Sequence, residues 1–167
     1  HGHAYVLPHE TIGDDAERIV FQTDNAMENT FRIHGTADTW RDKVGALCVG
    51  NSRLVFAVAC AFAGPLLRPA GLESGGFHFR GDSSSGKTTA LRVAASVYGG
   101  PSYLQRWRTT DNALEAIAAQ HSDCLLILDE LAQVDPKTAG ECAYMLANES
   151  SKARSTRTGA GRPRLSW

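Results

Sequence analysis

The pattern of apolar and polar residues changes near residue 36. Before this point, short apolar or alternating runs are separated by Gly, Asp and Asn, which is typical of short strands joined by turns. After it, apolar residues recur at helical spacing, so we expect a helix capped by Thr36 or Asp38. A second, mostly buried helix is expected over residues 51–67, ending at Gly64-Pro65. The strand-like runs are residues 5–7, 18–21 and 30–33.

From Phe77 onward the pattern alternates between strand and helix, after a Gly-containing joint at residues 71–76 that we expect to be flexible. The run 124–128 is continuously apolar, as expected for a strand buried on both faces of a parallel sheet. The alternation predicts an α/β fold: a parallel sheet with flanking helices, preceded by a small strand-rich segment and two helices. The other expected elements are strands at 77–79 and 103–107 and helices at 87–98, 110–119 and 136–148.

Composition and charge are those of an ordinary soluble domain. The chain has 167 residues, 43% hydrophobic and 21% charged, with a formal net charge of -1, so an argument for nucleic acid has to come from local charge. The longest apolar run, residues 54–63, is too short to cross a bilayer, and we expect no membrane partner. The cysteines show no CxxC pair, which predicts free thiols in a cytoplasmic protein. They are Cys48, Cys60, Cys124 and Cys142.

A phosphate-binding motif stands at the start of the expected helix 87–98. The sequence Gly81-Asp82-Ser83-Ser84-Ser85-Gly86-Lys87-Thr88, followed by Thr89, matches the P-loop pattern GxxxxGK[ST]. In this motif, consecutive backbone N–H groups point into one anion-sized nest, and the glycines allow conformations that a Cβ obstructs. Lys87 is expected to reach the β- and γ-phosphates and the Thr88 hydroxyl to bind Mg²⁺. The motif therefore predicts that residues 81–89 bind ATP or a close relative.

Two carboxylates, Asp129 and Glu130, directly follow the expected buried strand 124–128. Acids at the end of such a strand are costly unless they serve a metal or a reaction. In P-loop enzymes the first acid holds Mg²⁺ through water and the second polarises the attacking water, and we assign these roles to Asp129 and Glu130. Lys87 and Glu130 are then the expected catalytic residues, and Thr88 and Asp129 the expected metal site. The structural alternative is a strand that ends in solvated acids before Pro136.

Several other stretches follow the pattern of one family. They are residues 40–45 (WRDKVG), 50–54 (GNSRL), 75–79 (GGFHF), 128–130 (LDE), 135–136 (DP) and 139–148 (AGECAYMLAN). Over most of residues 36–167 the chain resembles the family called domain of unknown function 927 (DUF927). Its bacterial and phage members are often described as helicase-like ATPases of mobile elements, related to AAA+ replicative helicases.

The resemblance implies an AAA+-like ATPase core that is homo-oligomeric in the full-length protein and uses ATP and Mg²⁺ in DNA replication or mobile-element maintenance. We divide the chain into the strand-rich end of an upstream segment (1–35), a helical lead-in (36–70) and a partial P-loop NTPase core (71–167). AAA+ proteins carry a sensor residue and usually an arginine finger on later elements, and neither is assigned before Trp167. We therefore expect a C-terminally truncated core that binds nucleotide better than it hydrolyses it.

Two basic clusters are candidates for further contacts. Arg106, Trp107 and Arg108 are interpreted as the end of a strand packed beside the P-loop. The tail 150–167 contains no acidic residue and suits contacts with the phosphate backbone of DNA or RNA, although it also fits a solvated loop or arginines that serve a neighbouring subunit's nucleotide. Its basic residues are Lys152, Arg154, Arg157, Arg162 and Arg164.

The leading hypothesis is a helicase-like ATPase module that acts on DNA. One alternative is a P-loop kinase for a small molecule, which is less favoured because a kinase does not need a water-activating glutamate such as Glu130. The other alternative is a regulatory or binding module that uses ATP as a structural switch without a motor role.

Overall fold

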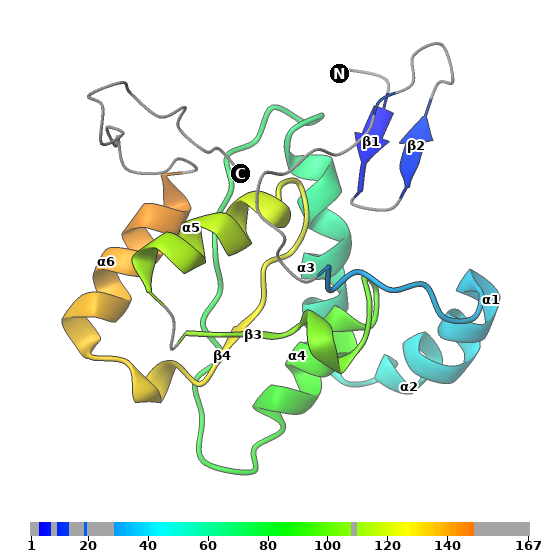
Figure 1. The fold of residues 1–167 in the computed structure, drawn as a ribbon. Coiled ribbons are helices and arrows are strands. Elements are labelled where there is room, and N and C mark those ends of the chain that lie inside the picture. The colour runs from blue at the N-terminus through cyan, green and yellow to red at the C-terminus, as the bar shows by residue number, and fades with distance from the viewer. Residues whose placement is uncertain (1–3, 8–9, 14–18, 20–28, 108–109, 149–167) are drawn as a thin grey trace.

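The computed structural model describes residues 4–7, 10–13, 19, 29–107 and 110–148 (Figure 1). These residues form a mixed α/β fold with two small sheets, one antiparallel and one parallel. In chain order the elements are β1 (Ala4–Val6), β2 (Thr11–Gly13), α1 (Ala37–Trp40), α2 (Ala46–Cys48), α3 (Ser52–Leu67), α4 (Lys87–Ala95), β3 (Gln105–Arg106), α5 (Asp111–Gln120), β4 (Leu128–Asp129) and α6 (Pro136–Ala147).

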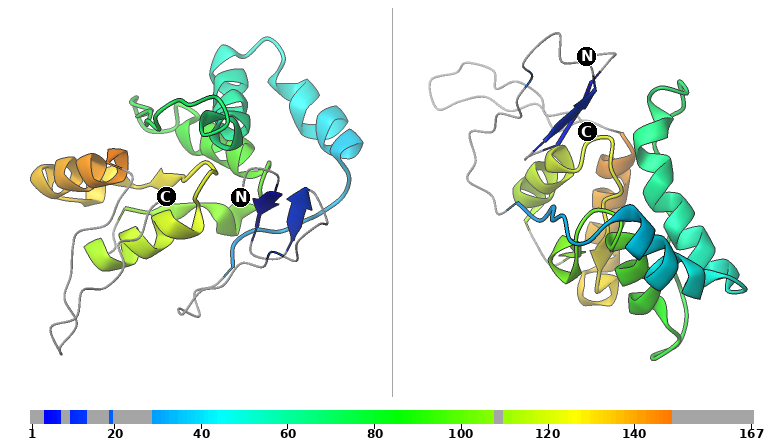
Figure 2. Two further views of the ribbon diagram at one scale, coloured as in Figure 1. Left: turned by 90° about the horizontal axis from the view of Figure 1, so that it is seen from above. Right: turned by 90° about the vertical axis from the view of Figure 1, so that its right-hand side faces the viewer.

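Four of the helices pack in two pairs, and the parallel strands lie between the first pair and α5. Helix α3 packs along α4, and α5 packs along α6. Strands β3 and β4 run between the α3–α4 pair and α5, while α1 and α2 lie at the end of the molecule away from α6 (Figure 2). Small side chains line the α3–α4 contact, since Ala57 and Ala61 of α3 and Ala90 and Ala94 of α4 are all buried. These alanines allow the two helices to approach closely.

Most of the expected helices are present, because their starts are fixed by local capping. Thr36 accepts a hydrogen bond from the Thr39 amide at 3.2 Å and begins α1, which continues through a π-helical turn (Arg41–Gly45) into α2. Asn51 caps α3 in the same way through the Leu54 amide. Helices α5 and α6 begin after Thr110 and Asp135, each of which accepts from an amide of the first turn.

The range 51–67 expected for this helix is confirmed, since α3 spans Ser52–Leu67, but the expected end at Gly64-Pro65 is wrong because the helix continues through Pro65. The expectation of a mostly buried helix is also wrong: its buried residues are Ala57 and Ala61, while Phe56 and Phe62 are exposed. Proline has no N–H, so the carbonyl four residues earlier, that of Ala61, loses its usual helical donor. The Tyr98 hydroxyl donates to this carbonyl at 2.6 Å and replaces the missing bond. Gly64 lies directly against the chain at Cys124, where a Cβ would be 2.9 Å from the carbonyl carbon. A tertiary hydrogen bond therefore allows the helix to continue beyond the proline.

The described residues do not show the expected parallel sheet of a P-loop NTPase. There the parallel sheet has two strands, with Gln105 opposite Leu128 and Arg106 opposite Asp129. Residues 77–79 form no strand: Phe77 is 71% exposed and packs edge-on against Phe56 instead of joining a ladder. The strand expected at 103–107 is reduced to β3. Of the run 124–128, only Leu128 belongs to a strand, β4, which also includes Asp129, and Ile127 is the residue of this run that is fully buried, so the expected continuous buried strand is wrong. Helix α4 ends at Ala95, earlier than the 98 expected.

The N-terminal region is partly as expected. Strand β1 overlaps the run 5–7 at Tyr5 and Val6, and it pairs with β2, which the sequence pattern did not indicate. The run 30–33 forms only an isolated bridge from Phe31 to Gly99, while Ile33 is exposed. The bridge is close enough that a Cβ on Gly99 would lie 2.7 Å from the Thr30 carbonyl oxygen. The run 18–21, apart from Ile19, lies outside the described residues.

An aromatic cluster occupies the core beneath the parallel strands. Tyr103 is fully buried, stacks on Tyr98 at a ring distance of 5.2 Å and donates through its hydroxyl to the Leu125 carbonyl at 2.8 Å. His121 packs against Phe31 and Tyr103; its Nδ1 lies 2.7 Å from the Ile117 carbonyl, and its Nε2 is buried without a partner among the described residues. Burial lowers the pKa of His121, so the ring is held neutral in the fold.

Within the described ranges, no helix has both the length and the apolar character needed to traverse a bilayer.

Candidate functional site

The P-loop connects an irregular segment to helix α4 by way of two left-handed residues. Ser84 has a φ of 60° and Gly86, the residue before the helix, a φ of 85°. Gly86 adopts this conformation without the steric cost that a side chain adds. A Cβ on Gly81 would lie 2.9 Å from the Ser85 hydroxyl oxygen, so the loop closes tightly at its first residue as well. The two glycines of the motif thus serve the backbone geometry.

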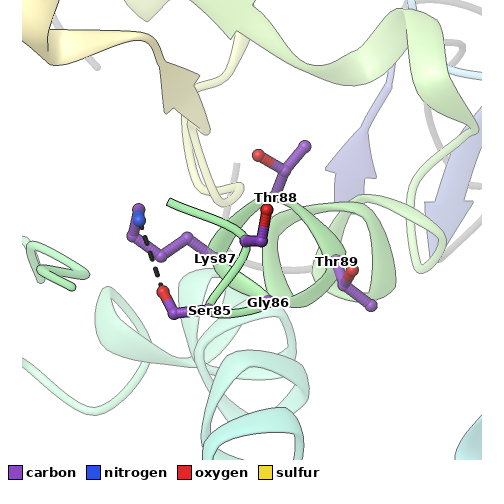
Figure 3. A pocket seen from close by; sticks show the side chains of 6 residues that line it. Ser85, Gly86, Lys87, Thr88 and Thr89 are labelled. Carbon is purple, nitrogen blue, oxygen red and sulfur yellow. Dashed lines mark hydrogen bonds between the residues drawn. The ribbon is translucent and has the colours of Figure 1, made fainter. Parts of the chain in front are cut away.

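The loop opens onto a hollow at the N-terminus of α4. The first helical hydrogen bond here runs from the Ala90 amide to the Gly86 carbonyl at 3.0 Å, so the preceding amides are not used by the helix. Such amides and the helix dipole favour an anion at this position. The hollow has a volume of about 200 Å³ and is lined by Ser84, Ser85, Gly86, Lys87, Thr88 and Thr89 (Figure 3).

The Lys87 side chain turns back across the loop. Its Nζ donates to the carbonyls of Gly81 and Asp82, both at 2.6 Å, and to the Ser85 hydroxyl at 3.3 Å (Figure 3). The two short bonds hold the ammonium at the mouth of the loop, whereas the bond to Ser85 is the longest of the three. Gly81 and Asp82 thus contact Lys87 through their carbonyls and do not line the hollow.

A hydrogen bond connects the P-loop to the acidic pair. The Thr88 hydroxyl donates to Asp129 Oδ2 at 3.3 Å, although the residues are 41 positions apart. Asp129 is the last residue of β4, and its other oxygen, Oδ1, accepts from the Glu130 amide at 2.8 Å. A hydroxyl and a carboxylate held together are oxygen ligands of the kind that Mg²⁺ prefers. The residues present therefore fit a phosphate-bound Mg²⁺.

Glu130 lies beside this pair, immediately after β4. Its backbone is left-handed, with a φ of 65° and a ψ of 37°, which is unusual for a residue with a Cβ. Its carboxylate faces Arg106 at the end of β3, with 3.8 Å between Arg106 Nε and Glu130 Oε2. The P-loop, the Thr88–Asp129 pair and the Glu130 carboxylate thus lie together at one end of the parallel strands.

Nearly all of the chain is similar to a protein family, since the model of the family described as domain of unknown function (DUF927) matches residues 1–165. The chain belongs to the DUF927 family. No curated protein matches its sequence. The resemblance noted in the sequence is therefore confirmed at the level of the family, whose description carries no activity.

The residues predicted to contact nucleic acid lie in parts of this DUF927 chain that the structure does not describe. The basic tail, with Lys152, Arg154, Arg157, Arg162 and Arg164, lies outside the described ranges, as does Arg108. The described part of the chain contains no cluster of three or more His, Cys, Asp or Glu side chains of the kind that alone encloses a metal.

The sequence pattern did not indicate the ion pair between Arg106 and Glu130. Arg106 was interpreted only as the end of a strand beside the P-loop, and β3 does end there. The pairing of β3 with β4, in which Arg106 is opposite Asp129, places the guanidinium next to the following residue. The ion pair follows from the pairing of β3 with β4, which the sequence pattern does not indicate.

Buried titratable groups away from the hollow have structural roles. The Tyr5 hydroxyl lies 2.8 Å from Cys124 Sγ and donates to the Asp123 carbonyl at 2.9 Å, which joins β1 to the segment before β4. Burial raises the pKa of the Cys124 thiol to about 11, so this cysteine stays protonated and is a poor nucleophile. All four cysteines are free, as the sequence predicted.

Proposed function

We propose that this protein binds ATP with Mg²⁺ at the P-loop of residues 81–89, in the hollow that residues 84–89 line, and hydrolyses it. The observation that carries the proposal is the hydrogen bond between Thr88 and Asp129. A Gly/Ser loop with an incidental lysine has no reason to contact an acid 41 positions away, whereas a Mg²⁺ site needs both oxygens at one point. The amides at the start of α4 that the helix does not use, together with the position of Lys87, support binding of the same ligand.

In this proposal each residue has a defined task. The loop amides and Lys87 hold the phosphates, and Thr88 and Asp129 hold Mg²⁺, Asp129 through a water molecule. When bound, Mg²⁺ neutralises phosphate charge. Glu130 orients and polarises the attacking water. The water oxygen forms a bond to the γ-phosphorus while the bond to the bridging oxygen breaks; its electron pair leaves with ADP, and the water proton passes through Glu130 to the released phosphate.

We further propose that the protein is an AAA+-type, helicase-like module that acts on DNA as a homo-oligomer. Its support is the resemblance described above, together with the β3–α5–β4 unit, whose parallel strands are joined by a helical crossover as in larger P-loop sheets. The basic tail supplies the proposed DNA contacts.

Nucleotide binding tests the proposal directly. We expect a fluorescent ATP analogue with Mg²⁺ to bind the native chain and to bind Lys87→Ala at least about tenfold more weakly, because a charge-assisted contact to phosphate is lost. Lys43→Ala, which removes an exposed lysine of the π-helical turn, is the matched control and should bind normally. Equal binding by all three proteins contradicts the assignment of the site.

Turnover distinguishes the hydrolase from the alternatives. Glu130→Gln should retain nucleotide and lose phosphate release, whereas a kinase is little affected by this change. Single-stranded DNA should raise the ATPase rate of the native protein. An unchanged rate with DNA contradicts the motor role, and tight binding without any hydrolysis favours the regulatory module.

A further inference from the structure

The Ser85 hydroxyl has a defined position in the P-loop, although neither the phosphate contacts nor the Mg²⁺ site assigned above use it. Ser85 lines the hollow, and its oxygen accepts from Lys87 Nζ at 3.3 Å (Figure 3). The same oxygen lies over Gly81, where an added Cβ would be 2.9 Å from it. The absence of a side chain at the first residue of the motif therefore leaves the space that the Ser85 hydroxyl occupies.

The contact with Lys87 determines how the Ser85 hydroxyl can bind a ligand. An ammonium has hydrogens to donate and no lone pair, so the hydroxyl oxygen is the acceptor in this contact and its own hydrogen is not used by it. Among the described residues, the Ser85 hydroxyl has no acceptor for that hydrogen. A hydroxyl that accepts from a cation is also a stronger donor, because neighbouring hydrogen bonds polarise one another. The group is therefore suited to donate to an anionic oxygen in the hollow.

The position beside the lysine indicates which phosphate the hydroxyl meets. The backbone amides of a P-loop hold the α- and β-phosphates, and its lysine reaches the β- and γ-phosphates. A hydroxyl within hydrogen-bonding distance of Lys87 Nζ thus belongs to the end of the site where the γ-phosphate lies. The Thr88 hydroxyl is directed elsewhere, since it donates to Asp129 Oδ2 at 3.3 Å.

We propose that Ser85 is a specificity-determining residue whose hydroxyl donates a hydrogen bond to the γ-phosphate and so raises the affinity for ATP over ADP. The inference rests on the proposed function, because it needs a nucleotide in the hollow. Removal of the hydroxyl leaves Lys87 held by the carbonyls of Gly81 and Asp82, both at 2.6 Å. The lysine then contributes to the binding of both nucleotides as before, and the loss is confined to the triphosphate.

Calorimetry with Mg²⁺ provides the first test, with a non-hydrolysable ATP analogue and with ADP as ligands. Ser85→Ala should bind the analogue about tenfold more weakly than the native protein, because a hydrogen bond to a charged oxygen is lost, and should bind ADP with unchanged affinity. Ser83→Ala is the matched control, since this serine of the same loop does not line the hollow, and it should bind both ligands normally. Equal losses for the analogue and ADP in Ser85→Ala, or no loss for either, overturn the proposal.

A phosphorus NMR spectrum of the bound analogue locates the contact independently of affinity. Measured at saturating analogue and Mg²⁺, the γ-phosphorus resonance should differ between the native complex and the Ser85→Ala complex, because its oxygen loses a donor. The α-phosphorus resonance should be the same in both complexes. A γ-phosphorus resonance that Ser85→Ala leaves unchanged overturns the proposal.

The two proposals fail in different ways. If the site is not a nucleotide site, the native protein and Lys87→Ala bind the fluorescent ATP analogue equally, and both proposals are overturned. If binding depends on Lys87 but Ser85→Ala leaves the ratio of the two affinities unchanged, for the non-hydrolysable ATP analogue and for ADP, the role of Ser85 alone is overturned.

Discussion

The hydroxyl of Tyr98 should contribute to the stability of the fold, because it supplies the hydrogen bond that Pro65 cannot donate within helix α3. It donates to the Ala61 carbonyl at 2.6 Å, and Ala61 is fully buried. Tyr98→Phe removes this donor and leaves a buried carbonyl that Pro65 cannot serve. An orphaned buried acceptor costs about 1–3 kcal/mol, so we expect the free energy of unfolding to fall by about 2 kcal/mol.

The same tyrosine substitution can be compared in a second variant, Pro65→Ala. In Pro65→Ala, residue 65 has an N–H that donates to the Ala61 carbonyl in the ordinary helical way. Tyr98→Phe should then cost less than about 1 kcal/mol, the net value of a hydrogen bond whose acceptor has another donor. The difference between the two costs is the coupling energy of the cycle.

Urea unfolding followed by circular dichroism measures both costs, provided that the m-value stays constant. Tyr144→Phe is the matched control, because this tyrosine of α6 is 73% exposed and its change should stay within about 0.5 kcal/mol. If Tyr98→Phe costs the same with and without Pro65, the hydrogen bond to the Ala61 carbonyl does not replace the one lost at Pro65, and the explanation of α3 fails.

Three further predictions concern packing, pH and metal. Gly64→Ala should lower the free energy of unfolding by about 1–3 kcal/mol, because its Cβ would lie 2.9 Å from the Cys124 carbonyl carbon; a neutral effect in the same urea assay would show that the contact is soft. Burial lowers the pKa of His121, so protons bind the unfolded chain preferentially as pH falls below the ordinary value of 6.5. The native protein should therefore lose stability from pH 6.5 downward more steeply than His121→Phe, and parallel pH profiles contradict this. Thr88→Val should weaken ATP binding about tenfold with Mg²⁺ and little in EDTA, as measured by calorimetry; equal losses in both buffers argue against a metal ligand.

The helix starts were predictable because their stabilising contacts are local. Thr36, Asn51, Thr110 and Asp135 each accept a hydrogen bond from an amide two or three residues later, and such spacing is visible in the sequence. Strand extents were not predictable in the same way, because a strand needs a partner that is distant in sequence. Residues 77–79 have strand-like composition but no ladder in the structure.

For the site, the sequence by itself determined the P-loop and the acidic pair, since the loop conformation depends on its own glycines and the acids follow an apolar run. It also determined membership of the DUF927 family. Only the tertiary structure decided that α3 passes through Pro65, because the replacement donor, Tyr98, is 37 positions from Ala61. Only the tertiary structure placed Arg106 against Glu130, because that contact depends on β3 lying beside β4, and strand order is set by packing between elements and not by any local pattern.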